Sequence, residues 1–143
     1  TNTYGPNDNY NPNSSHFIPA MIKKAHDIKI KNKNNFIVWG SGKVKREVMY
    51  VDDLADACIF FMKKKTRNNI VNIGTGEDFT INEYAKKILK ILNVKAKLKN
   101  DFSKPNGTKR KVLDISIAKK MGWRAKISFE EGILLAYKSF LKK

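Results

Sequence analysis

The chain has 143 residues, of which 41% are hydrophobic and 29% charged, and its formal net charge at pH 7 is +16. This balance is typical of one globular domain, and because the chain shows neither a secretion signal nor an apolar run of roughly 18 residues, we expect a soluble, cytoplasmic protein with no membrane partner. The charge suits a polyanion, but only four of the 29 basic residues are Arg, the residue that readers of nucleic acid prefer, so a basic nucleic-acid-binding module is kept only as an alternative.

The N-terminal part predicts a loop followed by a helix. Residues 1–14 carry Gly, Pro and Asn at the density of a loop. Apolar residues at helical spacing then begin, and Ser14 and Ser15 are both able to cap a helix that runs from Ser15 to about His26. Pro19 falls in the first turn of this helix, where proline is tolerated.

The middle of the chain predicts short strands that alternate with helices. Three apolar stretches, each followed by a turn or a cap, are the expected strands: 35–42, 46–50 and 69–76. Asp52 and Asp53 follow the second stretch as the cap and first-turn acid of a helix. Cys58, the only cysteine, falls on the apolar face of that helix and is interpreted as a buried structural thiol. Thr80 and Glu83 form a capping box for the next helix.

The C-terminal part predicts an edge strand at residues 95–101, a basic loop at 103–111 and two further helices. The first of these helices starts at Asp114, and the second is capped by Ser128 together with Glu131. The whole pattern predicts an α/β or α+β fold with one small sheet and about four helices.

Several common site signatures are missing from the sequence. The glycine turns at 40–42 and 74–76 do not continue into G-x-G-x-x-G, and no tyrosine has a lysine four residues later. His16, His26 and the single cysteine do not have the spacing of a zinc site. The chain also lacks an initiator Met, and we expect it to be part of a longer protein.

Five stretches resemble, in order and spacing, the C-terminal half of the GDP-L-fucose synthase family of extended short-chain dehydrogenases/reductases. The stretches are TNTYGPNDNYNPNSSHFIPAMIKK, VWGSGKVKREVMYVDDLADAC, NIGTG, SKPNGTKRKVLD and MGW. The resemblance covers all 143 residues and implies a C-terminal substrate-binding portion that lacks most of the Rossmann domain, with residues 1–14 as a loop leading from it. Another nucleotide-sugar epimerase or dehydratase of the same class remains an alternative.

The resemblance also implies an activity, a cofactor and partners. The whole enzyme is expected to turn GDP-4-keto-6-deoxy-D-mannose into GDP-L-fucose by 3,5-epimerisation and 4-keto reduction. NADP(H) is expected to bind mainly to an upstream N-terminal Rossmann half, which also carries the catalytic Ser, Tyr and Lys. The whole protein is expected to be a homodimer that binds a GDP-sugar, and this chain alone is expected to be inactive.

His16 is the candidate catalytic residue. A helix N-terminus disfavours imidazolium, and a neutral imidazole is able to exchange protons with a substrate. The resemblance implies that His16 does so beside the keto group, near the nicotinamide, and that Thr1, Asn2 and Thr3 line the same end of the cofactor. A solvent-facing or hydrogen-bonded histidine is the alternative.

The resemblance implies six substrate contacts. They are Lys24, Trp39, Arg46, Lys104, Asn106 and Lys111. The guanidinium of Arg46 suits a pyrophosphate because its fork pairs two oxygens at once, and Trp39 is expected beside the guanine. Asn106 stands where the family has Asp, so a carboxylate with two acceptor-only oxygens is replaced by an amide. The alternatives are a core tryptophan and solvated polar side chains.

Overall fold

Seven strands and five helices alternate along the two ranges that the structure, a computed structural model, describes: residues 1–66 and 70–142. The strands are β1 (Asn2–Tyr4), β2 (Asn35–Trp39), β3 (Lys45–Arg46), β4 (Val48–Tyr50), β5 (Phe79–Thr80), β6 (Lys97–Asp101) and β7 (Arg110–Lys111). The helices are α1 (Phe17–Ile30), α2 (Val51–Met62), α3 (Ile81–Ile91), α4 (Ser116–Lys120) and α5 (Phe129–Phe140). None of these helices has the length and apolarity needed to cross a bilayer.

The strands form three small sheets, so the expectation of one sheet is wrong. β1 pairs with β4 and β2 pairs with β6, both in parallel, while β3 lies between β5 and β7. The expected strand 46–50 is interrupted at Glu47. Arg46 ends β3 and Val48 begins β4, and these two strands belong to different sheets.

The start of the chain is a strand and not only a loop. Within residues 1–14, Asn2–Tyr4 form β1 and pair in register with Val48–Tyr50. The pairing joins residues that are far apart in sequence, and local composition does not report such contacts. The expected loop therefore holds only outside β1.

The third expected strand is absent over residues 70–76, and Asn69 lies outside the described residues. Individual hydrogen bonds, and not the ladder of a strand, hold this segment in place. The Asn72 amide donates to the carbonyl of Asp114 (3.1 Å), and the N–H of Gly76 donates to the Glu47 carboxylate (2.7 Å).

Helix α1 starts later and ends later than expected, at Phe17 and Ile30. Its N-cap is His16, which makes no side-chain cap bond, so the expectation that Ser14 or Ser15 caps the helix is wrong. The cause is the turn before it, where the N–H groups of both serines donate to the carbonyl of Asn11.

The expected caps of α3 and α5 are confirmed, whereas α4 starts at Ser116 and not at Asp114. Thr80 Oγ1 accepts from the N–H of Glu83 (3.1 Å), and Glu83 Oε2 accepts from the N–H of Thr80 (2.7 Å). Ser128 Oγ accepts from the N–H of Glu131 (3.2 Å). The N-cap of α2 is Tyr50, so the expectation that Asp52 caps this helix is wrong. Asp53 lies in the first turn, as expected, but it is buried and its carboxylate accepts from two backbone N–H groups just before α5.

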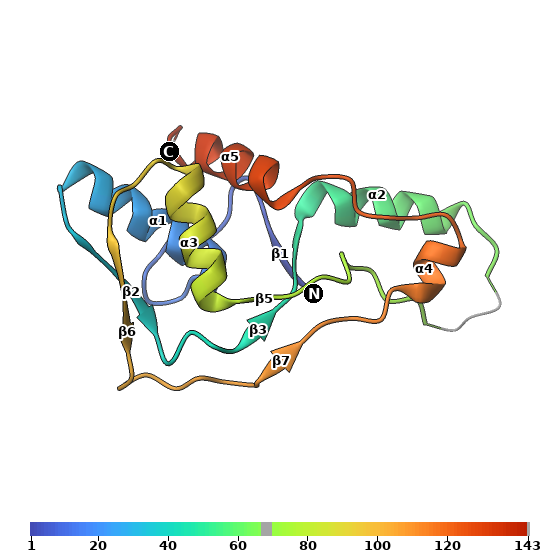
Figure 1. The fold of residues 1–143 in the computed structure, drawn as a ribbon. Helices are drawn as coiled ribbons and strands as arrows, with labels where there is room; N and C mark the ends of the chain where they lie inside the picture. The colour runs from blue at the N-terminus through green and yellow to red at the C-terminus, as the bar shows by residue number, and fades with distance from the viewer. Residues whose placement is uncertain (67–69, 143) are drawn as a thin grey trace.

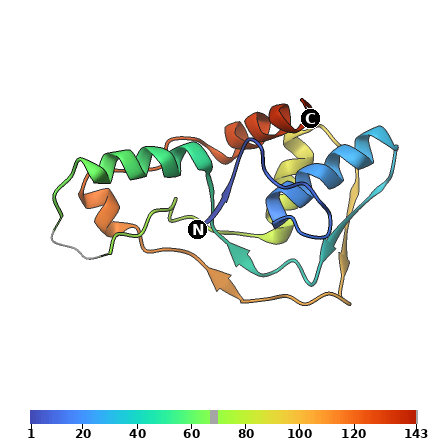
Figure 2. The same cartoon turned by 180° about the vertical axis from the view of Figure 1, so that it is seen from behind.

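Two hydrophobic clusters hold the molecule together. The larger lies among α1, α3 and α5 and includes Ile22, Ile88 and Ile133, each at most 1% exposed. The smaller joins α2 to α4 and includes Ala57 and Trp123. Figures 1 and 2 show α1, α3 and α5 grouped at one end of the molecule and α2 with α4 at the other.

Helix α2 has two apolar faces, of which one is buried in the structure. Ala57 is 0% exposed, whereas Ile59 is 56% and Met62 87% exposed. Cys58 is exposed as well, so the expectation of a buried thiol is wrong. We call Ala55, Cys58, Ile59 and Met62 the α2 stripe.

Candidate functional site

A cavity of about 390 Å³, here the α1–β2 cavity, lies between α1, the end of β2 and the turn into β3. Four of the six expected substrate contacts line it: Lys24, Trp39, Arg46 and Asn106. The other lining residues are Tyr10, Pro12, Ser15, Phe17, Ala20, Met21, Lys23, Asp27, Ile37, Val38, Val44 and Ile81. A mainly apolar wall with a few cations and amides is typical of a site for an aromatic, charged small molecule.

Trp39 is a surface residue of this cavity and not a core residue. Alternation along β2 buries Phe36 and Val38 and leaves Trp39 56% exposed. Two ammonium groups lie over its indole: Lys24 Nζ is 5.3 Å and Lys104 Nζ 5.4 Å from the ring centroid. These cation–π contacts hold an aromatic surface and two positive charges together.

Lys24 is half-buried beside the indole. Its Nζ donates to the carbonyl of Ile37 (3.1 Å), and burial lowers the pKa of the Lys24 ammonium. A partly desolvated cation gains more from an anionic ligand than a fully hydrated one does. The alternative of a merely solvated helix lysine therefore does not describe Lys24.

Arg46 is anchored at the end of β3. Its Nη1 donates to the carbonyls of Lys45 (2.7 Å) and Thr108 (2.6 Å). A guanidinium has five N–H donors, and the others make no hydrogen bond with any residue in the ranges 1–66 and 70–142. A guanidinium that is fixed in orientation and still has free N–H donors is suited to bind the oxygens of a phosphate.

Asn106 joins the basic loop to the glycine turn after β2. Its Oδ1 accepts from both the N–H (2.7 Å) and the Oγ (2.8 Å) of Ser41. Gly40 has a φ of 67°, and a Cβ there would crowd the Asn106 side chain. Because the carbonyl oxygen is engaged, the group that Asn106 offers to a ligand is its NH₂ donor.

Lys111 lies outside the α1–β2 cavity. It stands opposite Arg46 in the β3–β7 register and lines a different cavity, here the N-terminal cavity, of about 450 Å³. Thr1 and Asn2 line the same cavity, and Asn2 Nδ2 donates to the carbonyl of Glu47 (3.0 Å). The structure thus places Lys111 with two of the residues expected at the cofactor, while Thr3 lies beside them in β1.

His16 is at the rim of the α1–β2 cavity. It is exposed at the N-cap of α1, between Ser15 and Phe17, which both line the cavity. Its own side chain is not part of the cavity wall.

Sequence reasoning missed Glu47, a carboxylate that is 1% exposed. It accepts from the N–H groups of Gly76 (2.7 Å) and Leu113 (2.9 Å). A Cβ at Gly74 would clash with this carboxylate, so a glycine is needed there. Glu47 therefore links the junction between β3 and β4 to the glycine turn at 74–76 and to the segment after β7. The only signal of this role in the sequence is an acid inside an apolar stretch.

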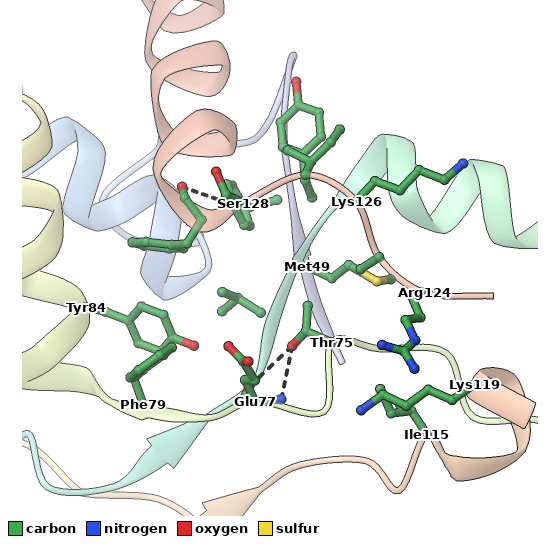
Figure 3. Close-up of a pocket in the computed structure, with 16 residues that line it drawn as sticks. Met49, Thr75, Glu77, Phe79, Tyr84, Ile115, Lys119, Arg124, Lys126 and Ser128 are labelled. Carbon is green, nitrogen blue, oxygen red and sulfur yellow. Dashed lines mark hydrogen bonds between the residues drawn. The ribbon is translucent and has the colours of Figure 1, made fainter. Parts of the chain in front are cut away.

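A third cavity, of about 320 Å³ between α4 and the start of α5, holds none of the expected site residues. Figure 3 shows Lys119 and Arg124 on one side of it and Phe79 and Tyr84 on the other. No three His, Cys, Asp or Glu side chains in the described part of the chain are placed to hold a metal ion.

Comparison with known proteins gives both a family and close relatives. The sequence profile of the NAD dependent epimerase/dehydratase family matches residues 1–74. The chain is 41% identical to GDP-L-fucose synthase 1 of Arabidopsis thaliana, over 99% of this chain and 44% of that protein. It is 39% identical to the GDP-L-colitose synthase of Yersinia pseudotuberculosis, over 99% of this chain and 46% of that protein. The chain thus spans less than half the length of these relatives.

A solved structure agrees with the fold. The GDP-L-fucose synthetase of Naegleria fowleri bound to NADP matches with a TM-score of 0.89 at 25% identity, over 99% of this chain and 45% of that chain. The α/β fold and the resemblance expected from the sequence are therefore confirmed.

Proposed function

The chain belongs to the NAD dependent epimerase/dehydratase family, and from this we propose that residues 1–143 are the GDP-sugar-binding portion of a GDP-L-fucose synthase. The whole enzyme converts GDP-4-keto-6-deoxy-D-mannose to GDP-L-fucose by epimerisation at two carbons and reduction of the keto group. The identity of 41% to the Arabidopsis enzyme supports this reaction.

The α1–β2 cavity is the observation that carries the proposal. It offers the exposed indole of Trp39, which has two ammonium groups over its ring, and the anchored guanidinium of Arg46, which has free N–H donors. An aromatic face suits a purine, and fixed cations suit a diphosphate. Arg46 binds the diphosphate, and Trp39 with Lys24, Lys104 and Asn106 binds the guanosine end.

His16 serves proton exchange at the sugar. Epimerisation beside a keto group needs one group to remove a proton and another to return it from the opposite face. His16 is the N-cap of α1 and lies at the rim of the cavity, and we expect a sugar that extends from the diphosphate to lie on this side of the cavity. Its partner in the exchange belongs to residues outside this chain.

NADP(H) is the proposed cofactor, and when bound it supplies the hydride for the reduction. The residues present fit one edge of such a molecule: Thr1, Asn2 and Lys111 bring a hydroxyl, an amide and a cation to the N-terminal cavity. The side-chain NH₂ of Asn2 donates to the backbone carbonyl of Glu47. The amide oxygen of Asn2 is an acceptor that suits the carboxamide of nicotinamide.

The remaining contacts come from an N-terminal Rossmann half of the same protein. A two-stranded parallel sheet is usually part of a larger sheet covered on both faces, and β1 and β4 form only such a pair. The α2 stripe leaves further apolar surface to be covered. The whole protein is a homodimer in this proposal, with the dimer contacts outside this chain.

Calorimetric titration of the whole protein with GDP tests the proposal. We expect GDP to bind, and Arg46→Ala to weaken binding roughly tenfold or more, because charge-assisted hydrogen bonds to phosphate are lost. Arg124→Ala is the matched control, since Arg124 is exposed and outside the α1–β2 cavity. A chain that ignores GDP but binds an oligonucleotide with a steep salt dependence would be a nucleic-acid binder instead.

GDP-L-colitose synthesis is the second candidate reaction. Identity to that relative is 39%, against 41% to the GDP-L-fucose synthase. Assays of the whole protein with NADPH and the keto precursor of each sugar distinguish the two, because only the true substrate should oxidise NADPH at an appreciable rate.

A further inference from the structure

The hydroxyl of Ser15 has no partner in the structure. Over residues 1–66 and 70–142, Ser15 Oγ is the one buried side-chain nitrogen or oxygen that makes no hydrogen bond. Burying a hydroxyl without a hydrogen bond costs free energy, and folded proteins contain few such groups. A specific reason is therefore needed for this one.

The backbone fixes Ser15 in place without using its side chain. Its N–H donates to the carbonyl of Asn11 (2.9 Å), and the next residue, His16, is already the N-cap of α1. The neighbouring serine differs: Ser14 is exposed and its Oγ accepts from Asn9 Nδ2 (3.0 Å). Capping and turn formation thus account for the serine backbone but not for the Ser15 hydroxyl.

Ser15 also lines the α1–β2 cavity, together with Lys24 and Arg46. It stands at the N-terminal end of α1, a helix whose first turn has neither an acidic residue nor a side-chain cap. That end of a helix carries a partial positive charge and attracts anionic oxygens. The unpartnered hydroxyl and the helix end therefore favour the same kind of group, an oxygen acceptor.

We propose that the Ser15 side chain turns toward this cavity when the ligand binds, and that Ser15 Oγ then donates its hydrogen bond to an oxygen of the diphosphate or of the sugar attached to it. This inference rests on the proposed function, because it takes the ligand to be a GDP-sugar. The hydroxyl has no partner in the free protein because the ligand is its partner.

The test uses Ser15→Ala and Ser14→Ala in the whole protein. Calorimetric titrations with GDP and with GDP-mannose measure affinity, and thermal unfolding without ligand measures stability. Because Ser15→Ala removes an unsatisfied group, we expect it to leave the melting temperature unchanged or to raise it. We expect it to weaken binding about five- to tenfold, which is one lost hydrogen bond. Ser14→Ala should bind both ligands as the unaltered protein does.

The two ligands distinguish the sources of the oxygen. Equal weakening for GDP and GDP-mannose assigns the contact to the diphosphate, and weakening for GDP-mannose alone assigns it to the sugar. Unchanged affinity for both ligands in Ser15→Ala overturns the inference, as does a clear loss of stability, which would reveal an internal role. If the unaltered protein binds neither ligand, the proposed function itself is wrong and the inference is wrong with it.

Discussion

Glu47 is a buried carboxylate that forms none of the ion pairs found within residues 1–66 and 70–142. The charge of this carboxylate is instead stabilised by hydrogen bonds from the N–H groups of Gly76 and Leu113, which belong to two different segments of the chain. A carboxylate that accepts backbone N–H bonds is well satisfied, but those donors have no substitute if it is removed.

We expect Glu47→Ala to lower the free energy of unfolding by roughly 2 kcal/mol or more, because the N–H groups of Gly76 and Leu113 lose the buried carboxylate that accepts from them. Urea unfolding of the whole protein measures this change. Glu130→Ala is the control, since Glu130 is exposed on α5 and should change stability by no more than about 0.5 kcal/mol. Equal midpoints for the two variants would contradict a structural role for Glu47.

We expect His16→Asn to slow epimerisation in the whole enzyme by about 10²- to 10⁴-fold, the usual contribution of a general acid or base. Deuterium uptake from D₂O at the carbons that flank the keto group, followed by NMR, measures this step directly. His26→Asn is the control, because His26 bonds to the Tyr137 hydroxyl (3.0 Å) and does not line the α1–β2 cavity. Normal uptake in His16→Asn would rule out the catalytic role.

The family resemblance singled out residues that the structure brings together around one cavity, but it did not single out the groups that support them. Lys24, Trp39, Arg46 and Asn106 were all expected, and they meet in one cavity. Ser15 was interpreted as a possible cap, because sequence shows a capping residue type but not which residue the turn makes the N-cap. Burial decides the role of such a residue, and burial depends on distant segments.

Among the elements, α3 is the one whose start depends most directly on local chemistry. Its capping box satisfies the N–H groups of both Thr80 and Glu83. We expect Thr80→Ala to lower the free energy of unfolding by about 1 kcal/mol. Lys86→Ala, an exposed change on the same helix, should change it by no more than about 0.5 kcal/mol.

The same capping box predicts a pH dependence. The hydrogen bond from the backbone N–H of Thr80 lowers the pKa of the Glu83 carboxyl. A lowered pKa in the folded state gives stability that is present above the unfolded-state pKa and is lost as the pH falls through the folded value. Glu83→Gln keeps an oxygen acceptor but does not titrate, so its stability difference from the unaltered protein should shrink between pH 7 and the acid range. A difference that is constant with pH would contradict this account.

The helices were predictable because their signals are local, whereas the sheets were not. A capping box or an apolar periodicity lies within a few residues, but β1 is a strand only because Val48–Tyr50 lie beside it. Helix α2 shows the limit of periodicity. Its apolar residues cover two faces, and the pattern alone does not say which face, that of Ala57 or that of Cys58, packs against α4.

At the scale of the whole molecule, the parts left uncovered lie close together in the fold. β1 and β4 form an isolated parallel pair, and α2 follows β4 directly. Figure 1 shows the N-terminus and β1 in the middle of the molecule, next to the start of α2. A sheet that continues beyond β1, with α2 against its face, would cover both surfaces at once.

Cys58 reports whether this surface is covered in the whole protein. In the structure the thiol is exposed within the α2 stripe, beside Ile59 and Met62. If residues outside this chain pack on the stripe, we expect Cys58 to react with a thiol reagent such as DTNB much more slowly in the native whole protein than after unfolding in urea. The control is Lys86→Cys, which places a second thiol on an exposed position of α3 and should react rapidly in the native state. Rapid reaction of both thiols would mean that the α2 stripe stays open, and the proposed N-terminal half would then have to pack elsewhere.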